Sequence, residues 1–454
     1  MNIFSLVKDR FLGKSVPYLN SVQARKELAW VLAGQVFSML GSLATLKILT
    51  TILPTHVYGE VNLIVIACTL PTLVLLAPIT QSCYRYYAEH DEKGTLPSLL
   101  GTGIALQLSA VCLTGIGVGL GFSIGWWDRA NIPPATILLG FGLFAMDAGR
   151  TICLTAAAAA RKRMIVAFGF AVDAWLRPLF AMALVSFWGQ RSSAAIGGYT
   201  LAGACTLIPL SLWLAKNMGG FTVKREILRE FVRYGLPYGV WGIFGWAQAG
   251  ADRYMVDHWL SRADVGRYVA GSQVGTFPFS VAGAFVGQLV SPVLFQRAGD
   301  GSDPGRARSA KNLLLTVVGL FLLFGGVALA FLYFLGPALL RLMTGRPEYE
   351  ISRPVLMTIA VGGLLFQISQ VCSSMFLIQK KSFLVLWPKI LGGVTAVAVG
   401  LLAIPGWGLP GAAFSFACAS AALLAGHWIG PARKAWRTVP VESKLGLGEN
   451  ETRA

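Results

Sequence analysis

The sequence predicts an all-α, polytopic membrane protein with about twelve transmembrane helices. Of its 454 residues, 55% are hydrophobic and only 13% are charged, and the mean hydropathy is +0.63. A soluble domain carries about 25% charged residues, so most of this chain is expected to lie in lipid. A window of about 19 residues finds candidate spans near 28–50, 57–82, 98–124, 134–160, 164–187, 195–215, 235–259, 267–295, 312–336, 353–378, 383–404 and 408–429.

Lysine and arginine alternate between the two sides of these spans. The N-terminal tail and every second loop after it carry 26 of the 38 basic residues, whereas the intervening loops carry seven. The positive-inside rule therefore places both termini in the cytoplasm. That orientation requires an even number of spans, which agrees with twelve.

Two six-helix halves are expected on either side of a basic linker. The predicted boundaries are 1–27 for a cytoplasmic N-terminal segment, 28–215 for the first bundle, 216–234 for an amphipathic cytoplasmic linker, 235–430 for the second bundle and 431–454 for a basic cytoplasmic tail. Apolar residues at helical spacing in the N-terminal segment fit a helix on the membrane surface. A disordered basic tail is the alternative.

A short internal repeat supports the two halves. The pattern Leu53-x5-Gly59-x11-Pro71 recurs as Leu260-x5-Gly266-x11-Pro278. In each copy a glycine opens a span that carries a proline about three turns further on. Repeated halves flanking a midplane site are a common transporter construction.

Apart from Arg267 and Arg353, which are the first residues of their spans, five basic residues fall inside the predicted spans: Lys47, Arg150, Arg177, Arg253 and Lys389. A cation at the centre of a membrane helix costs roughly 2.5 to 3.5 kcal/mol even on the lenient insertion scale. Several of them in one chain indicate a watery cavity that holds an anion. The sequence therefore favours a transporter with a negatively charged cargo.

Two of these cations have a carboxylate one turn away. Asp147 precedes Arg150 by three residues and Asp173 precedes Arg177 by four, so each pair shares a helix face. One interpretation is an ion pair that only joins helices. The other places both pairs in a central cavity, where the planar guanidinium forks bind phosphate and the carboxylates hold them between cargoes.

The other three cations have competing explanations. Arg253 follows Asp252 near the end of the seventh span, where a structural ion pair is as good an interpretation as cargo binding. Lys47 and Lys389 lie nearer the span ends, so their side chains reach the headgroups or line the cavity. Asp147, Asp173 and Asp252 are the candidate charge partners or proton carriers.

Several classes of protein are disfavoured. The basic residues are spread over many loops, which fits contact with anionic lipid rather than nucleic acid. The seven cysteines form no CxxC pair and the four histidines lack metal-ligand spacing, so neither a metal site nor a disulfide framework is expected. The sequence contains no GxxxxGK[ST] motif, and no predicted external loop is longer than about 20 residues. An enzyme is therefore not expected, although a membrane glycosyltransferase or polymerase stays a minor alternative.

The segment from Tyr234 to Gln296 resembles a known family. Its features are the Tyr-Gly-Leu-Pro start, the run Asp252-Arg253-Tyr254 and the later Val265-Gly266-x-Tyr268; LPTHVYGEVNLIV is the first-half counterpart. Together they are similar to the polysaccharide-transporter branch of the multidrug/oligosaccharidyl-lipid/polysaccharide exporter superfamily. The twelve-span layout extends the resemblance over nearly the whole chain.

The resemblance implies two pseudo-repeated six-helix bundles around a V-shaped central cavity. It also implies a flippase of the bacterial inner membrane. Such a protein moves a polyprenyl-diphosphate-linked oligosaccharide, as in O-antigen, capsule or exopolysaccharide assembly, to the outer leaflet by alternating access. The expected partners are the bilayer, the lipid-linked cargo and other polysaccharide-assembly proteins. No cofactor is expected, and coupling to H+ or Na+ is left open. A cation-coupled multidrug antiporter of the same superfamily is the main alternative.

Overall fold

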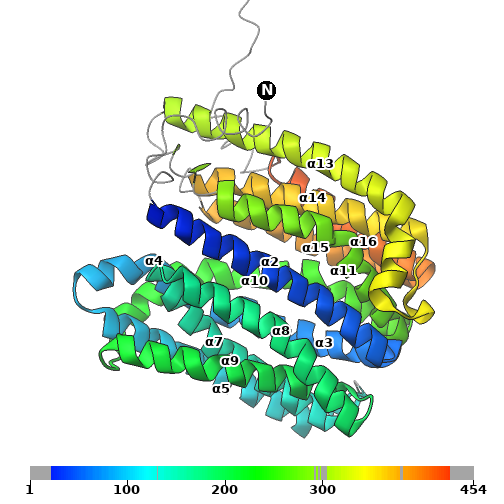
Figure 1. Cartoon of the computed structure of the whole chain (residues 1–454), viewed down its shortest axis with the longest axis horizontal. Coiled ribbons are helices and arrows are strands. Elements are labelled where there is room, and N and C mark those ends of the chain that lie inside the picture. The colour runs from blue at the N-terminus through cyan, green and yellow to red at the C-terminus, as the bar shows by residue number, and fades with distance from the viewer. Residues whose placement is uncertain are drawn as a thin grey trace, which may run out of the picture.

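The computed structural model describes residues 22–129, 131–290, 293–294, 297, 304–378 and 382–429. Over these residues the chain is helical (Figure 1). The first half holds α2 (Val22–Ile52), α3 (Thr55–Pro71), the π-helical turn η2 (Thr72–Leu76), α4 (Ala77–Glu92), α5 (Leu96–Ser123), α6 (Trp126–Arg129), α7 (Pro134–Ala159), α8 (Arg163–Trp188) and α9 (Ser192–Met218). The second half holds α10 (Arg225–Trp259), α11 (Arg262–Phe285), the π-helical turn η3 (Val286–Val290), α13 (Pro304–Thr344), η4 (Pro347–Tyr349), α14 (Arg353–Ile378), η5 (Ser382–Val385), α15 (Leu386–Trp407) and α16 (Leu409–Ala425).

These helices confirm the predicted all-α membrane fold. Within the described residues, nine helices are long and apolar enough to cross a membrane, and α16 is a shorter apolar helix. In that count α3, η2 and α4 form a single span. Helices α10 and α11 occupy the predicted seventh and eighth spans and are less apolar than α2, α5 or α13. The chain is therefore a multi-pass membrane protein.

The two halves lie side by side, and α2 lies at the boundary between them. In Figure 1, α5, α7, α8 and α9 form one group, and α13, α14 and α16 form the other. Small residues let α2 pack closely on α8, because a Cβ on Gly34 would lie 2.6 Å from Ala167 Cβ and one on Gly41 would lie 2.8 Å from Ala174 Cβ. Helix α2 therefore belongs to the first half and presents its other face to the second.

One end of the molecule is closed by a core that both halves share. We call the end with the α2–α3, α8–α9 and α10–α11 connections the predicted periplasmic end. The largest buried apolar cluster there joins Leu49 and Tyr58 of the first half to Val265, Tyr349 and Ala412 of the second. Towards the opposite, predicted cytoplasmic end, the second half has an apolar cluster of its own. The halves thus share a core at the predicted periplasmic end, whereas towards the other end they meet through α10.

The repeated glycines meet where the halves join. A Cβ on Gly59 would overlap the carbonyl oxygen of Arg262, and one on Gly266 would overlap that of Thr55. Helices α3 and α11 therefore cross with their backbones in contact, which only glycine permits. The short sequence repeat corresponds to a symmetrical contact between equivalent helices.

The predicted linker is not a separate element. Its amphipathic part forms the first turns of α10, which run without a break into the seventh span. Ile227 and Phe231 are buried there against residues of the first half, including Cys83 and Leu99. The proposed surface helix in 1–27 and the tail 431–454 lie outside the described residues, except that 22–27 begin α2.

Candidate functional site: a cavity with a ring of four charges

A cavity of about 870 Å³ lies between the two halves. The first half lines it through α2, α7, α8 and α9, and the second half through α11. Its polar lining consists of Gln35, Ser38, Ser42, Thr45, Asp147, Arg150, Arg163, Asp173, Arg177, Tyr199, Gln273, Thr276 and Ser280. A second cavity of about 320 Å³ shares Arg150, Val166 and Phe170 with the first and extends to Gln81 and Tyr84 of α4.

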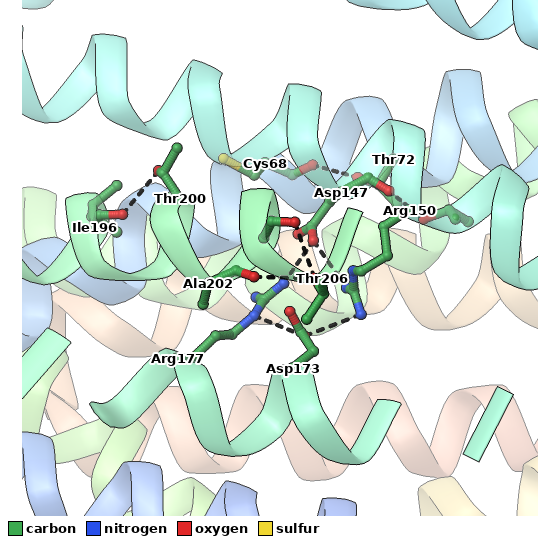
Figure 2. Close-up of polar contacts among 12 residues, drawn as sticks. Cys68, Thr72, Asp147, Arg150, Asp173, Arg177, Ile196, Thr200, Ala202 and Thr206 are labelled. Carbon is green, nitrogen blue, oxygen red and sulfur yellow. Dashed lines mark hydrogen bonds and ion pairs between the residues drawn. The ribbon is translucent and has the colours of Figure 1, made fainter. Parts of the chain in front are cut away.

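Four of these side chains form a ring of ion pairs that joins α7 to α8 (Figure 2). Asp147 Oδ1 accepts hydrogen bonds from Arg150 Nη2 at 2.9 Å and from Arg177 Nη2 at 2.6 Å. Asp173 Oδ2 lies 3.1 Å from Arg150 Nη1 and 2.9 Å from Arg177 Nε. Each carboxylate thus bridges both guanidinium groups with a single oxygen.

The ring differs from the two separate pairs that the sequence predicted. The i,i+3 and i,i+4 pairs are present, and cross-pairs between the helices complete the ring. The side chains of Arg150 and Arg177 are 11% and 19% exposed, and that of Asp173 is 9% exposed. The four formal charges cancel, which lowers the cost of placing them inside a membrane protein.

The ring keeps unused hydrogen-bonding capacity. Asp173 Oδ1 and Arg150 Nε are buried without a hydrogen-bond partner. Arg177 Nε, although close to Asp173, is not aligned for a hydrogen bond. Buried polar groups normally find partners. The unused atoms of the ring are therefore available to bind another polar group. The geometry fits both static joining of α7 and α8 and reversible binding of an anion.

Two cavity residues were not singled out from the sequence. Arg163 lines the cavity from the first turn of α8, and Tyr199 of α9 lies beneath Arg177, whose Cζ is 5.7 Å from the ring centroid. Arg163, Phe170 and Arg177 recur every seven residues, so they share one face of α8. That periodicity was the available signal for Arg163.

Lys47 lies at the closed end rather than in the cavity. Its Nζ donates to the carbonyl oxygen of Leu342, at the C-terminal end of α13, at 2.6 Å. Thr50 Oγ1 donates to the carbonyl of Thr344 nearby. Because the last carbonyls of a helix lack partners within it, Lys47 caps α13 and links the two halves.

Arg253 and Asp252 also lie away from the lining of the cavity. Asp252 is buried and accepts a hydrogen bond from Tyr268 Oη at 2.6 Å and one from the backbone N–H of Arg253. Asp257, one helical turn beyond Arg253, pairs with Arg262 of α11 at 3.4 Å. This arrangement joins α10 to α11, which favours a structural function for Asp252.

Lys389 is buried inside the second half. It is 5% exposed, and its Nζ lies 5.6 Å from the ring centroid of Trp241 and 5.3 Å from that of Phe366. Snorkelling to the headgroups therefore does not describe it. Of the five predicted cations, Arg150 and Arg177 line the large cavity together, and the other three do not line it.

Comparison with known proteins identifies the fold. The lipid II flippase MurJ in an inward closed conformation has a TM-score of 0.67 at 12% identity, over 90% of this chain and 89% of that chain. A MOP superfamily transporter from Pyrococcus furiosus has a TM-score of 0.63 at 13% identity, over 90% of this chain and 95% of that chain. An inward-facing multidrug resistance MATE family transporter of the MOP superfamily has a TM-score of 0.62 at 14% identity, over 94% of this chain and 97% of that chain. No family model and no curated protein matches the sequence.

The chain therefore has the fold that these transporters share. The superfamily-level fold expected from the resemblance is confirmed. At 12 to 14% identity the likeness concerns the fold alone, and the cargo has to be argued from the site.

Proposed function

We propose that the protein is a bacterial inner-membrane flippase that moves a polyprenyl-diphosphate-linked oligosaccharide by alternating access. The observation that carries this proposal is the pair of guanidinium groups, Arg150 and Arg177, held 2.9 and 2.6 Å from one oxygen of Asp147 at the wall of the central cavity. Two converging guanidinium groups match the spacing and charge of a diphosphate. The protein acts as a transporter rather than an enzyme in this proposal.

The carboxylates regulate access to the arginines. With Asp147 and Asp173 in place the ring is neutral, so a weakly charged solute gains little from binding there. A diphosphate carries enough charge to displace one carboxylate from both guanidiniums. Arg163, on the same face of α8, adds a further positive charge nearer the predicted cytoplasmic end.

The observed conformation fits the loading state of this cycle. Three contacts close the predicted periplasmic end. Lys47 of α2 donates to a carbonyl of α13, α3 crosses α11, and Tyr349 Oη donates to the carbonyl of Leu53 at 2.8 Å. The cavity lies on the other side of these contacts. In this proposal cargo enters from the cytoplasmic side, and release requires these contacts to break.

A multidrug antiporter is the second candidate. The comparisons support it equally, because MATE transporters share the fold. The side chain of Asp147 is 24% exposed at the cavity wall, where it is available to a cationic solute. The presence of Arg150, Arg163 and Arg177 in the same lining favours an anion.

Single replacement of Arg150 or Arg177 by Ala in cells tests the proposal. We expect lipid-linked glycan to accumulate on the cytoplasmic face and surface glycan to fall while protein levels hold. Arg267→Ala is the matched control, because it breaks an Arg–Asp pair at 2.9 Å outside the cavity. Normal surface glycan in both cavity variants would exclude the proposed function.

A neutral variant separates binding from folding. Removing one arginine leaves a partly buried carboxylate without its partner, which destabilises proteins by about 3 to 5 kcal/mol in fully buried cases. The double variant Arg177→Gln/Asp173→Asn removes one charge of each sign and leaves the Arg150–Asp147 pair. We expect it to fold normally and to fail in transport.

A further inference from the structure

Helix α10 carries a row of aromatic rings that the proposed diphosphate site does not use. Tyr234, Tyr238 and Trp241 follow one another with ring centroids 5.6 and 5.8 Å apart, and Tyr86 of α4 extends the row with its centroid 5.7 Å from Tyr234. We call these four residues the aromatic row. All four side chains are partly exposed.

The row faces away from lipid. On α10, the exposed apolar residues Leu236, Val240 and Ile243 mark the lipid-facing side. Helical spacing puts Tyr234, Tyr238 and Trp241 on the other side. There the row lies between α4, which α10 contacts through Gly235 and Gly239, and α15.

The row ends at two buried polar groups. Lys389 Nζ lies 5.6 Å from the Trp241 centroid, and no carboxylate in the described part of the chain pairs with it. Gln248 is 3% exposed, and neither its Oε1 nor its Nε2 has a hydrogen-bond partner. A Cβ on Gly392, one turn along α15 from Lys389, would lie 3.2 Å from Gln248 Oε1. Lys389 of α15 thus contacts α10, and Gln248 of α10 contacts α15, so both polar groups lie between these two helices.

We propose that the aromatic row, Lys389 and Gln248 form a glycan subsite, mainly in the second half and bordered by α4, that recognises a sugar ring bearing a carboxylate. Aromatic faces carry negative charge density and attract the C–H groups of a sugar. An ammonium pairs with a carboxylate, and a carboxamide both donates to and accepts from hydroxyl groups. This inference rests on the proposed function.

The chemistry separates this subsite from the diphosphate site. A single ammonium among rings lacks the paired forks that suit a diphosphate, whereas Arg150 and Arg177 provide them. A cationic solute would be repelled by Lys389, which has no compensating carboxylate here. The diphosphate would thus lie against α7 and α8, and the glycan would lie between α4, α10 and α15.

Calorimetric titration of the full chain in nanodiscs tests the subsite with two free tetrasaccharides. One is hyaluronan tetrasaccharide, which alternates glucuronate with N-acetylglucosamine, and the other is neutral chitotetraose. We expect the glucuronate probe to bind about tenfold more tightly, the effect of one charge-assisted hydrogen bond. Equal binding of the two probes, or binding of neither, would overturn the proposal.

Variants assign the effect to residues. Lys389→Met keeps the apolar stem against the rings and should abolish the preference without weakening chitotetraose binding. Trp241→Leu should weaken both probes by about tenfold, because it removes the ring face against which the C–H groups of the sugar pack. Trp188→Leu, at an exposed position (62%) at the end of α8, should change neither. Retention of the glucuronate preference in Lys389→Met would refute the assignment.

The failure of the subsite is distinguishable from failure of the proposed function. Lost transport in the Arg150 and Arg177 variants, together with equal binding of the two tetrasaccharides, would remove the subsite alone. An intact glucuronate preference together with normal transport in those variants would refute the proposed function and not the glycan subsite.

Discussion

Replacing Asp173 with Asn should strengthen binding of a diphosphate lipid. Asp173 Oδ2 lies 3.1 Å from Arg150 Nη1 and 2.9 Å from Arg177 Nε. An anion that binds both guanidiniums has to displace these contacts. A hydrogen bond to a charged group contributes about 1.5 to 3 kcal/mol. Because both arginines are partly exposed, we expect the gain in binding free energy to lie at the lower limit of this range. Neutralising the carboxylate should therefore lower the Kd about tenfold.

Binding of undecaprenyl diphosphate to the purified protein in nanodiscs measures this effect. The titration is repeated at two salt concentrations, because screening weakens an ionic contact that solvent reaches. Asp264→Asn is the control, since Asp264 pairs with Arg267 outside the cavity. Unchanged or weaker binding by Asp173→Asn, with a normal thermal unfolding profile, would refute competition between the carboxylate and the cargo.

Three further predictions concern the closed end. Gly266→Leu should lower the unfolding free energy by about 1 to 3 kcal/mol, because any side chain there overlaps the facing backbone; an unchanged thermal unfolding curve would contradict the α3–α11 contact. Lys47→Met loses the bond to the Leu342 carbonyl and should shift the population about fivefold towards a periplasm-open state. The shift is measured as a longer spin-label distance between the predicted periplasmic ends of α2 and α13. An unaltered distance distribution would contradict the capping of α13 by Lys47. Tyr349→Phe leaves the buried Leu53 carbonyl unpaired and should lower the unfolding free energy by about 1 to 3 kcal/mol. The spin-label distance between α2 and α13 should also lengthen. A variant as stable as the wild type would show that this bond is dispensable.

The fold followed largely from the sequence because lipid imposes simple rules. Span positions came from hydropathy, and the structure has helices at all the predicted places. The repeat of Gly59 and Gly266 was visible because close backbone contact requires glycine at both positions. The predicted inner-membrane location and the cytoplasmic position of both termini stay predictions.

The candidate site was only partly predictable. Helical spacing indicated the Asp147–Arg150 and Asp173–Arg177 pairs, but the cross-pairs depend on how α7 and α8 face each other. The acceptor for Lys47 lies 295 residues further along the chain, so no local pattern indicated it. Depth in the membrane, which the sequence does show, does not determine which way a cation points.

Flipping of a lipid-linked oligosaccharide by the reconstituted protein tests the central claim most directly. A fluorescent polyprenyl-diphosphate oligosaccharide is incorporated into proteoliposomes, and its exposure on each leaflet is followed by quenching from outside. The wild type should flip the lipid, Arg177→Gln/Asp173→Asn should reduce the rate at least about tenfold, and Arg267→Ala should match the wild type. Equal rates for the wild type and the double variant would contradict the claim that Arg177 binds the diphosphate.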